Sequence, residues 1–381
     1  MADYVIKNGT VYVPGTGRFE KRDLYVSEGL MADGKALSEE CKVIDAAGCY
    51  VTAGFVDYHV HYFKGGADNG VDPDMASFPN GVTTAVDGGT CGVSSFEIFK
   101  RAVIDRADTG LFAQLLTASG GQLTERYMER LDAELIDGER IAAMFKRFPD
   151  VLAGLKTRIS ANIIEPEKAR ASLERSVELA EQLGCNLTVH ITNPAMDLEE
   201  MAGILRKGDV MCHIFQNKGR ENILDEDGNV RGGIWKARER GVLFDACNGR
   251  SNFDLKVARA ALSQGFFPDI ISSDINTCSY YEGVLHSLPR VLSKYLAFGQ
   301  PLERILDAAI FAPAQVIGHP ELASLEAGTP ADLVIFRVED HPMVYLDHTN
   351  GANRLEGNQA IVPQLTMKAG KVVYSQVWFG A

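Results

Sequence analysis

The sequence lacks several features that would place it in a membrane or an export pathway. No uninterrupted apolar run reaches the roughly 18 residues that a membrane-spanning helix needs. The N-terminal segment MADYVIKNGTVYV does not show the basic, apolar and small-residue order of a signal peptide. We therefore expect a cytoplasmic protein with no membrane association.

Basic residues and paired cysteine motifs are also scarce. Lys and Arg number 38 against 51 Asp and Glu, which gives a net charge of -13 and disfavours nucleic acid as a partner. The seven cysteines are widely spaced, odd in number and form no CxxC motif. A disulfide scaffold is thus excluded, and we expect reduced thiols.

What the sequence does contain is a regular alternation of β-rich runs and helical segments. At 381 residues the chain can hold one large domain and a smaller one, since domains average about 150 residues. Eight β-rich runs occur, at 51–61, 82–89, 111–118, 151–158, 186–192, 210–215, 242–248 and 269–275. Intervening segments such as 94–107, 126–147, 167–183, 235–240, 255–264 and 283–297 have helical character. This pattern predicts an α/β fold, a (β/α)8 TIM barrel.

The two ends of the chain have a different pattern. Both contain short alternating strands and turn signals, such as NG and PGTG near the start and KAG near the end. Neither end has enough apolar residues to form a core alone. We predict a small β-sandwich domain built from residues 1–52 and 325–381, beside a barrel over residues 53–324.

Residues capable of metal chemistry gather at the ends of the predicted strands. Active sites of such barrels lie at the carboxyl ends of the strands. Four of the eight histidines fall there, together with an aspartate at the end of the last run: His59, His61, His190, His213 and Asp274. His59 and His61 stand two apart on an extended segment, so both imidazoles lie on one side. Each histidine alone is more often a core residue, but the set as a whole favours a zinc or similar divalent metal site.

Lys156 and Arg158 end the fourth run. A lysine among metal ions and apolar neighbours becomes neutral more easily, because burial and positive charge both disfavour the ammonium. A neutral amine can take up carbon dioxide to form a carbamate with two oxygens. Snorkelling of the lysine to solvent is the ordinary alternative.

The segments GFVDYHVHYF, AGLKTRIS, TVHIT, MCHIF, ISSDI and GTPADLVIF together resemble the amidohydrolase superfamily. They are most similar to its amidohydrolase/deacetylase group, the dihydroorotase-like and adenine deaminase-like members with a binuclear centre. The resemblance implies His59, His61 and Asp274 on a first metal ion and His190 and His213 on a second. It also implies N6-carboxylysine at Lys156 between the two ions, which we expect to be zinc.

The resemblance is incomplete at two places. Dihydroorotases usually carry an arginine soon after HxH, where this chain has Tyr62, Phe63 and Lys64. Arg158, with Arg220 and Arg250 in later loops, can supply a carboxylate clamp instead. Cys91 lies in a segment similar to that of D-aminoacylases, where the cysteine is a metal ligand, so it is a possible additional ligand.

These observations predict a metal-dependent amidohydrolase or deacetylase. It would hydrolyse an amide or ester bond of a small carboxylate-bearing substrate, an N-acyl or O-acyl acid or a cyclic amide, with Asp274 as general base and then acid. Substrate contacts are expected from Arg158, Asn217, Asn248 and Asn276. Cyclic-amide hydrolase, D-aminoacylase and heterocycle deaminase activities are the alternatives, and a scaffold without activity is a further one. A homo-oligomer is expected.

Overall fold

A computed structural model of the 381-residue chain describes residues 2–34, 40–124, 126–281, 287–347 and 353–376. Its centre is a curled seven-stranded parallel sheet, in the order β14-β13-β12-β11-β10-β9-β8. The strands are β8 (Phe55–Val60), β9 (Val82–Asp87), β10 (Gly110–Leu116), β11 (Leu152–Arg158), β12 (Asn186–His190), β13 (Val210–Cys212) and β14 (Leu243–Asp245). Neighbouring strands in sequence are neighbours in space, as expected for successive βα units.

The eighth predicted run, 269–275, lies between the two edges of this sheet. Asp245 of β14 and Ile270 form one parallel bridge, and Val60 of β8 and Ile275 form another. The backbone amide of Asp274 also donates to the carbonyl of His59 at 2.8 Å. Seven of the eight sequence runs therefore each contain one strand of this sheet, and the eighth is a bridging segment.

The first predicted run needs a correction, because residues 51–61 form two strands in different sheets. β7 (Tyr50–Ala53) pairs with the outer strands, and β8 begins after Gly54. A Cβ at Gly54 would lie 2.0 Å from the Thr83 hydroxyl oxygen, so the chain passes from one sheet to the other against a neighbouring strand. The sequence does not indicate the break between β7 and β8, because both strands are buried and the apolar run continues through them.

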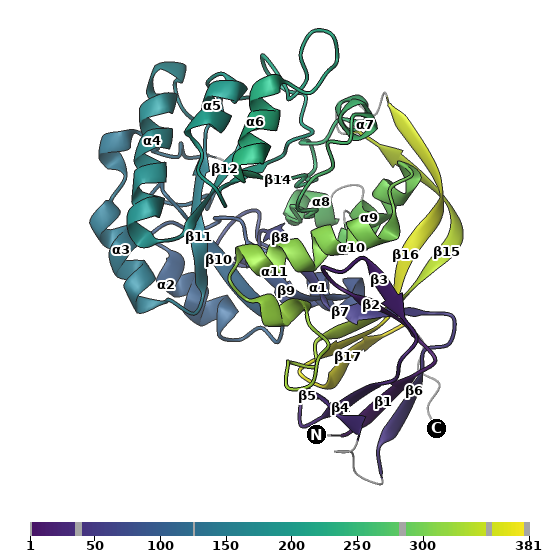
Figure 1. Cartoon of the computed structure of the whole chain (residues 1–381). Helices are drawn as coiled ribbons and strands as arrows, with labels where there is room; N and C mark the ends of the chain where they lie inside the picture. The colour runs from purple at the N-terminus through teal and green to yellow at the C-terminus, as the bar shows by residue number, and fades with distance from the viewer. Residues whose placement is uncertain (1, 35–39, 125, 282–286, 348–352, 377–381) are drawn as a thin grey trace.

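Helices surround the parallel sheet, and most of them lie over its outer face (Figure 1). They are α1 (Pro73–Ser77), α2 (Phe96–Phe99), α3 (Gly138–Arg147), α4 (Pro166–Leu183), α5 (Leu198–Ile204), α6 (Gly232–Arg240), α7 (Leu255–Ser263), α8 (Thr277–Tyr281), α9 (Leu288–Ala297), α10 (Leu302–Ala309) and α11 (Phe311–Val316). Short 3-10 or π turns are η2 (Phe78–Asn80), η3 (Lys100–Ile104), η4 (Ala133–Leu135) and η5 (Pro320–Ala323). α4 begins with proline in its first turn and ends at Gly184 in the left-handed region, the usual start and stop signals.

The helix predicted at 126–147 is shorter than expected. α3 starts at Gly138 because the Asp137 carboxylate caps it by accepting from the Arg140 amide at 3.0 Å. Likewise α9 starts after the capping Ser287, and residues 283–286 of that prediction lie outside the described part of the chain.

The two ends of the chain do meet in one sheet. The six-stranded sheet has the order β17-β16-β15-β7-β2-β3, from β2 (Thr10–Val13), β3 (Arg18–Glu20), β15 (Leu333–Leu346), β16 (Arg354–Lys368) and β17 (Lys371–Ser375) with β7. A four-stranded sheet, β5-β4-β1-β6, contains β1 (Tyr4–Lys7), β4 (Leu24–Ser27), β5 (Leu30–Ala32) and β6 (Lys42–Asp45). Figure 1 shows the four-stranded sheet projecting below the helix-covered sheet, whereas β15 and β16 run along its right side.

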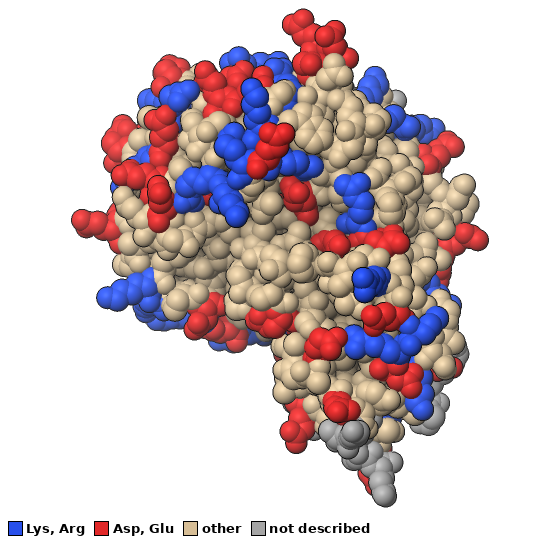
Figure 2. Space-filling view, viewed as in Figure 1, with Lys and Arg blue, Asp and Glu red and all other residues tan. Residues whose placement is uncertain are grey.

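The surface is mixed in charge. Acidic and basic side chains are interspersed over the face shown in Figure 2. Among the described residues, no helix has both the length and the apolar character that a bilayer crossing requires.

Candidate metal centre

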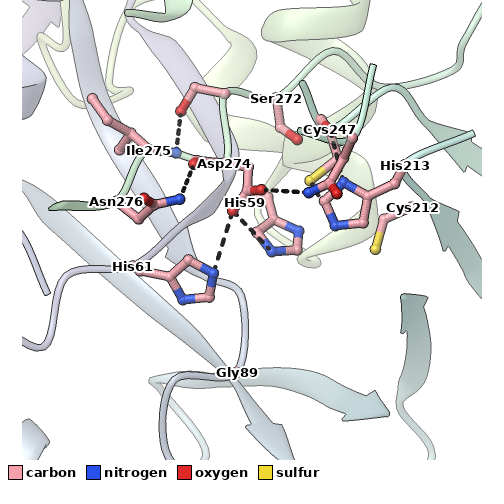
Figure 3. A network of polar contacts seen from close by, with 12 residues as sticks. His59, His61, Gly89, Cys212, His213, Cys247, Ser272, Asp274, Ile275 and Asn276 are labelled. Atoms are coloured by element: carbon pink, nitrogen blue, oxygen red, sulfur yellow. Dashed lines mark hydrogen bonds and ion pairs between the residues drawn. The ribbon is translucent and has the colours of Figure 1, made fainter. Parts of the chain in front are cut away.

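Three of the predicted ligands converge at the carboxyl end of the parallel sheet. Nε2 of His61 lies 3.3 Å from Oδ1 of Asp274, and Nε2 of His59 lies 4.0 Å from the same oxygen. Figure 3 shows the Asp274 carboxylate facing both imidazoles. All three side chains are buried, and one ligand atom from each lies within 4.8 Å of the other two.

Hydrogen bonds select the nitrogen that two of the histidines present. The Thr90 hydroxyl donates to Asp87 at 2.9 Å, so its oxygen can accept from Nδ1 of His61, 2.7 Å away. Nδ1 of His213 lies 2.8 Å from the carbonyl oxygen of Cys247, which can only accept. Both rings therefore carry their proton on Nδ1 and leave Nε2 free as a ligand.

His190 and His213 lie next to this group and extend it. The ring centroids of His190 and His213 are 4.5 Å apart, and those of His59 and His213 are 5.5 Å apart. Nδ1 of His190 is 2.9 Å from the Ser160 hydroxyl. The four strand-end histidines thus form one continuous group.

Lys156 points into this group from β11. Its side chain is buried, with Nζ 3.4 Å from Nδ1 of His59 and 3.1 Å from Sγ of Cys212. Among the described residues, no hydrogen bond or ion pair joins this amine to a carboxylate. An amine so placed is suited to carboxylation, which would add two oxygens beside the imidazoles.

Burial favours the neutral form of two of the four histidines. Burial, with Lys156 nearby, lowers the pKa of His59 to about 4, and burial next to His213 lowers the pKa of His190 well below its ordinary value. Burial alone would raise the pKa of Asp274, but the imidazoles around its carboxylate, His61 foremost, hold it below its ordinary value. Neutral imidazoles and an ionised carboxylate are the forms that bind metal.

The backbone at the site is strained. His213, Cys247 and Asp274 have φ of 68°, 37° and 54°, in the left-handed region that residues with a side chain rarely adopt. Such conformations cost about 1–3 kcal/mol each and concentrate at functional sites. The backbone also packs closely against the site at Gly249. A Cβ at this position would lie 2.3 Å from Oδ2 of Asp274.

The ligand spacing fits a divalent ion. Two nitrogen or oxygen ligands at about 2.0–2.1 Å on a tetrahedral zinc ion are separated by about 3.3 Å. The distance between His61 Nε2 and Asp274 Oδ1 is 3.3 Å. The donor set and its geometry therefore fit a metal.

A cavity of about 570 Å³ opens above this cluster. The predicted substrate residues Arg158 and Asn276 line it. Arg158 donates through Nη1 to Gln122 at 3.0 Å and pairs with Glu129, so this guanidinium already holds one carboxylate. Asn276 donates to the Asp274 carbonyl at 3.0 Å.

The other two predicted asparagines lie outside the cavity lining. The Asn217 amide donates to Asp254 at 3.1 Å, and the Asn248 oxygen accepts from the buried Lys294. Sequence reasoning missed Gln122 and Asn252, which do line the cavity; both lie in loops without a motif. Asn252 donates to Oδ2 of Asp274 at 3.2 Å.

Asp57 supports the site through a neighbour of Asp274, whereas Cys91 does not. Asp57 accepts two hydrogen bonds from Ser273, at 2.9 Å from the amide and 2.5 Å from the hydroxyl, and so fixes the residue before Asp274. Cys91 is buried but does not line the cavity.

A parallel α/β sheet with a histidine and aspartate centre at its carboxyl end defines a class of metal-dependent hydrolases. The chain belongs to the amidohydrolase family, whose model matches residues 50–373. It is 30% identical over 314 residues to a protein named deacetylase from Agrobacterium fabrum, covering 82% of this chain and 76% of that protein. A deacetylase from Brucella anthropi is also 30% identical, covering 86% and 81%.

Solved structures give the same family. A dihydroorotase matches with a TM-score of 0.87 and 28% identity, covering 98% of each chain. An adenine deaminase matches with a TM-score of 0.87 and 27% identity, covering 99% of this chain and 100% of the other. The protein is a hydrolase acting on carbon–nitrogen bonds, which is one of the two bond types, amide and ester, that the sequence predicted.

Proposed function

We propose that this chain is a binuclear metal hydrolase that removes an acyl group from a small carboxylate-bearing molecule. The observation that carries the proposal is the approach of His61 Nε2 to Asp274 Oδ1, at 3.3 Å, with the His61 proton held on Nδ1 by Thr90. Deacetylase-named relatives at 30% identity support acyl removal.

In this proposal residues 269–275 complete a closed (β/α)8 barrel over residues 53–324. The bridges to β8 and β14 support closure. Residues 1–52 and 325–381 form the second, discontinuous domain, supported by the pairing of β7 with β15.

The ligand roles follow the positions of the side chains. His59, His61 and Asp274 would hold one ion, and His190 and His213 a second. Lys156, after its amine adds to carbon dioxide and releases a proton, would contribute a carbamate between them. Zinc suits this imidazole and carboxylate set. Bound divalent ions supply Lewis acidity, which activates water and polarises the substrate carbonyl.

The chain's own residues then complete the reaction. The Asp274 carboxylate, oriented by Asn252, accepts the proton of the attacking water and passes it to the leaving nitrogen or oxygen. Arg158 lies at the cavity wall, where its guanidinium pairs with Glu129. In the proposal the substrate carboxylate replaces the Glu129 carboxylate in this ion pair.

A cyclic-amide hydrolase is the second candidate, because the dihydroorotase structure is similar at a TM-score of 0.87. The residues after HxH do not favour it. Tyr62 and Phe63 are buried in the core, and Lys64 pairs with Asp72 at 2.9 Å outside the cavity lining. Arg158, which lines the cavity together with Lys218 and Arg250, is then the cation proposed for a substrate carboxylate.

A substrate screen tests the proposal. Metal-loaded protein would be assayed with N-acyl amino acids, O-acyl hydroxy acids, cyclic ureides and aminated heterocycles. We expect release of a carboxylic acid from the first two classes. Ring opening alone, or ammonia release alone, would replace the proposal with one of the alternatives.

A further inference from the structure

Two buried thiols lie at the proposed metal centre, and neither is part of the ligand set described above. Cys212 ends β13, and Cys247 follows β14 by two residues. Both are fully buried. Cys91, the cysteine that the sequence singled out, does not line the cavity.

The Cys247 thiol lies beside the ligand nitrogen of His213. Its Sγ is 3.7 Å from Nε2 of His213, the nitrogen that the Cys247 carbonyl itself leaves free by accepting from Nδ1. One residue therefore both orients the imidazole and places a thiol beside its ligand nitrogen. Figure 3 shows His213 and Cys247 side by side next to Asp274.

The spacing is that of two ligands on one ion. A sulfur at about 2.3 Å and a nitrogen at about 2.0–2.1 Å on a tetrahedral zinc ion are separated by about 3.6 Å. The distance between Cys247 Sγ and His213 Nε2 is 3.7 Å. Ligand atoms of His59, His213 and Cys247 all lie within 4.8 Å of one another.

Cys212 is placed differently. Its Sγ accepts from the Lys156 amine at 3.1 Å and also interacts with His59, His213 and Cys247, so it is shared among several groups. Among the described residues, the groups of three ligand atoms that could hold an ion include Cys247 and not Cys212.

We propose that the Cys247 sulfur is a metal ligand, bound to the same ion as His213. The inference rests on the proposed metal centre and specifies its chemistry. Binding replaces the S–H bond by a metal–sulfur bond, and the proton leaves to solvent. A thiolate ligand makes the centre softer, so it favours zinc, cobalt and cadmium over manganese and magnesium.

Cobalt substitution tests this inference without a substrate. Cobalt bound by a thiolate shows a charge-transfer band in the near ultraviolet, whereas nitrogen and oxygen ligands give only the weaker visible bands. The protein would be loaded with Co²⁺ and its metal content measured, as wild type and as Cys247→Ser, Cys212→Ser and Cys91→Ser. Cys185→Ser, at the opposite end of β12, is the matched control.

We expect the charge-transfer band in wild type and in every variant except Cys247→Ser, which would keep its visible bands. A wild-type protein with full cobalt content and no such band overturns the Cys247 inference and leaves the metal centre intact. Retention of the band in Cys247→Ser, or its loss in Cys212→Ser or Cys91→Ser alone, overturns it too. Failure of the wild type to take up metal refutes the proposed function itself.

X-ray absorption of the zinc-loaded wild type covers the case in which Cys247→Ser does not fold. We expect a sulfur scatterer at about 2.3 Å from zinc, retained in Cys212→Ser and Cys91→Ser. A shell of nitrogen and oxygen alone contradicts the inference.

Discussion

Gly88 lies directly against His59, and alanine there would displace the imidazole. An ideal Cβ at Gly88 would lie 2.3 Å from Nε2 of His59 and 2.4 Å from Cδ2. Ordinary contacts begin near 3.4 Å, so the ring must move by about 1 Å. Gly88 does not have a positive φ, so the effect is steric and not a backbone penalty.

A displacement of about 1 Å can cost about 10²-fold in rate, which is about 2.7 kcal/mol of transition-state free energy. Disturbing a ligand's support lowers metal affinity by about 10- to 100-fold. We expect Gly88→Ala to reduce zinc affinity within this range, measured by competition with a chromophoric chelator. Once a substrate is identified, kcat/KM should fall by at least the same factor.

Gly120→Ala is the matched control. A Cβ at Gly120 meets nothing within 4 Å, and its φ is not positive. This variant should bind zinc as the wild type does, with a free energy of unfolding within about 0.5 kcal/mol. If Gly88→Ala folds and keeps wild-type zinc affinity, His59 is not a ligand in the position described.

Three further predictions concern single side chains. Burial lowers the pKa of Lys294 well below its ordinary 10.5, so the unfolded chain binds more protons and wild-type stability rises as pH increases toward 10.5. Lys294→Met should reduce the increase of the free energy of unfolding with pH by up to about 1.4 kcal/mol per pH unit, measured in denaturant titrations. Lys146→Met, at an exposed position, should leave this increase unchanged. The same increase in Lys294→Met and in the wild type would contradict the burial argument. Asp274→Asn should lower kcat by about 10²- to 10⁴-fold, the usual range for general acid–base catalysis, while the protein still binds metal; unchanged turnover would exclude the proton-transfer role. Arg158→Met should raise KM for a carboxylate substrate by about 10- to 100-fold, the value of a charged hydrogen bond, and an unchanged KM would place the clamp elsewhere.

The strand framework and the side chains at strand ends could be predicted because both follow from local periodicity. His59 and His61 share one side of an extended strand, and parallel strands bring His190, His213 and Asp274 to the same end. The structure does bring these five side chains together at one end of the sheet.

The loop residues could not be predicted in the same way. Asn248 looked like a substrate contact, yet it follows β14 and binds the buried Lys294 instead. Cys247 reaches His213 through a left-handed backbone conformation, with φ of 37°, that composition does not indicate. The break between β7 and β8 was missed because pairing partners from residues 333–336, far along the chain, decide which sheet each strand joins.

The metal content per chain tests the central claim most directly. Protein expressed with and without added bicarbonate would be analysed for bound metal, alongside Lys156→Met, which cannot form a carbamate. The proposal predicts two ions per chain with bicarbonate and a lower content for Lys156→Met. A firm content of one ion per chain with full activity, unaffected by bicarbonate or by the loss of Lys156, would contradict the bridged binuclear centre.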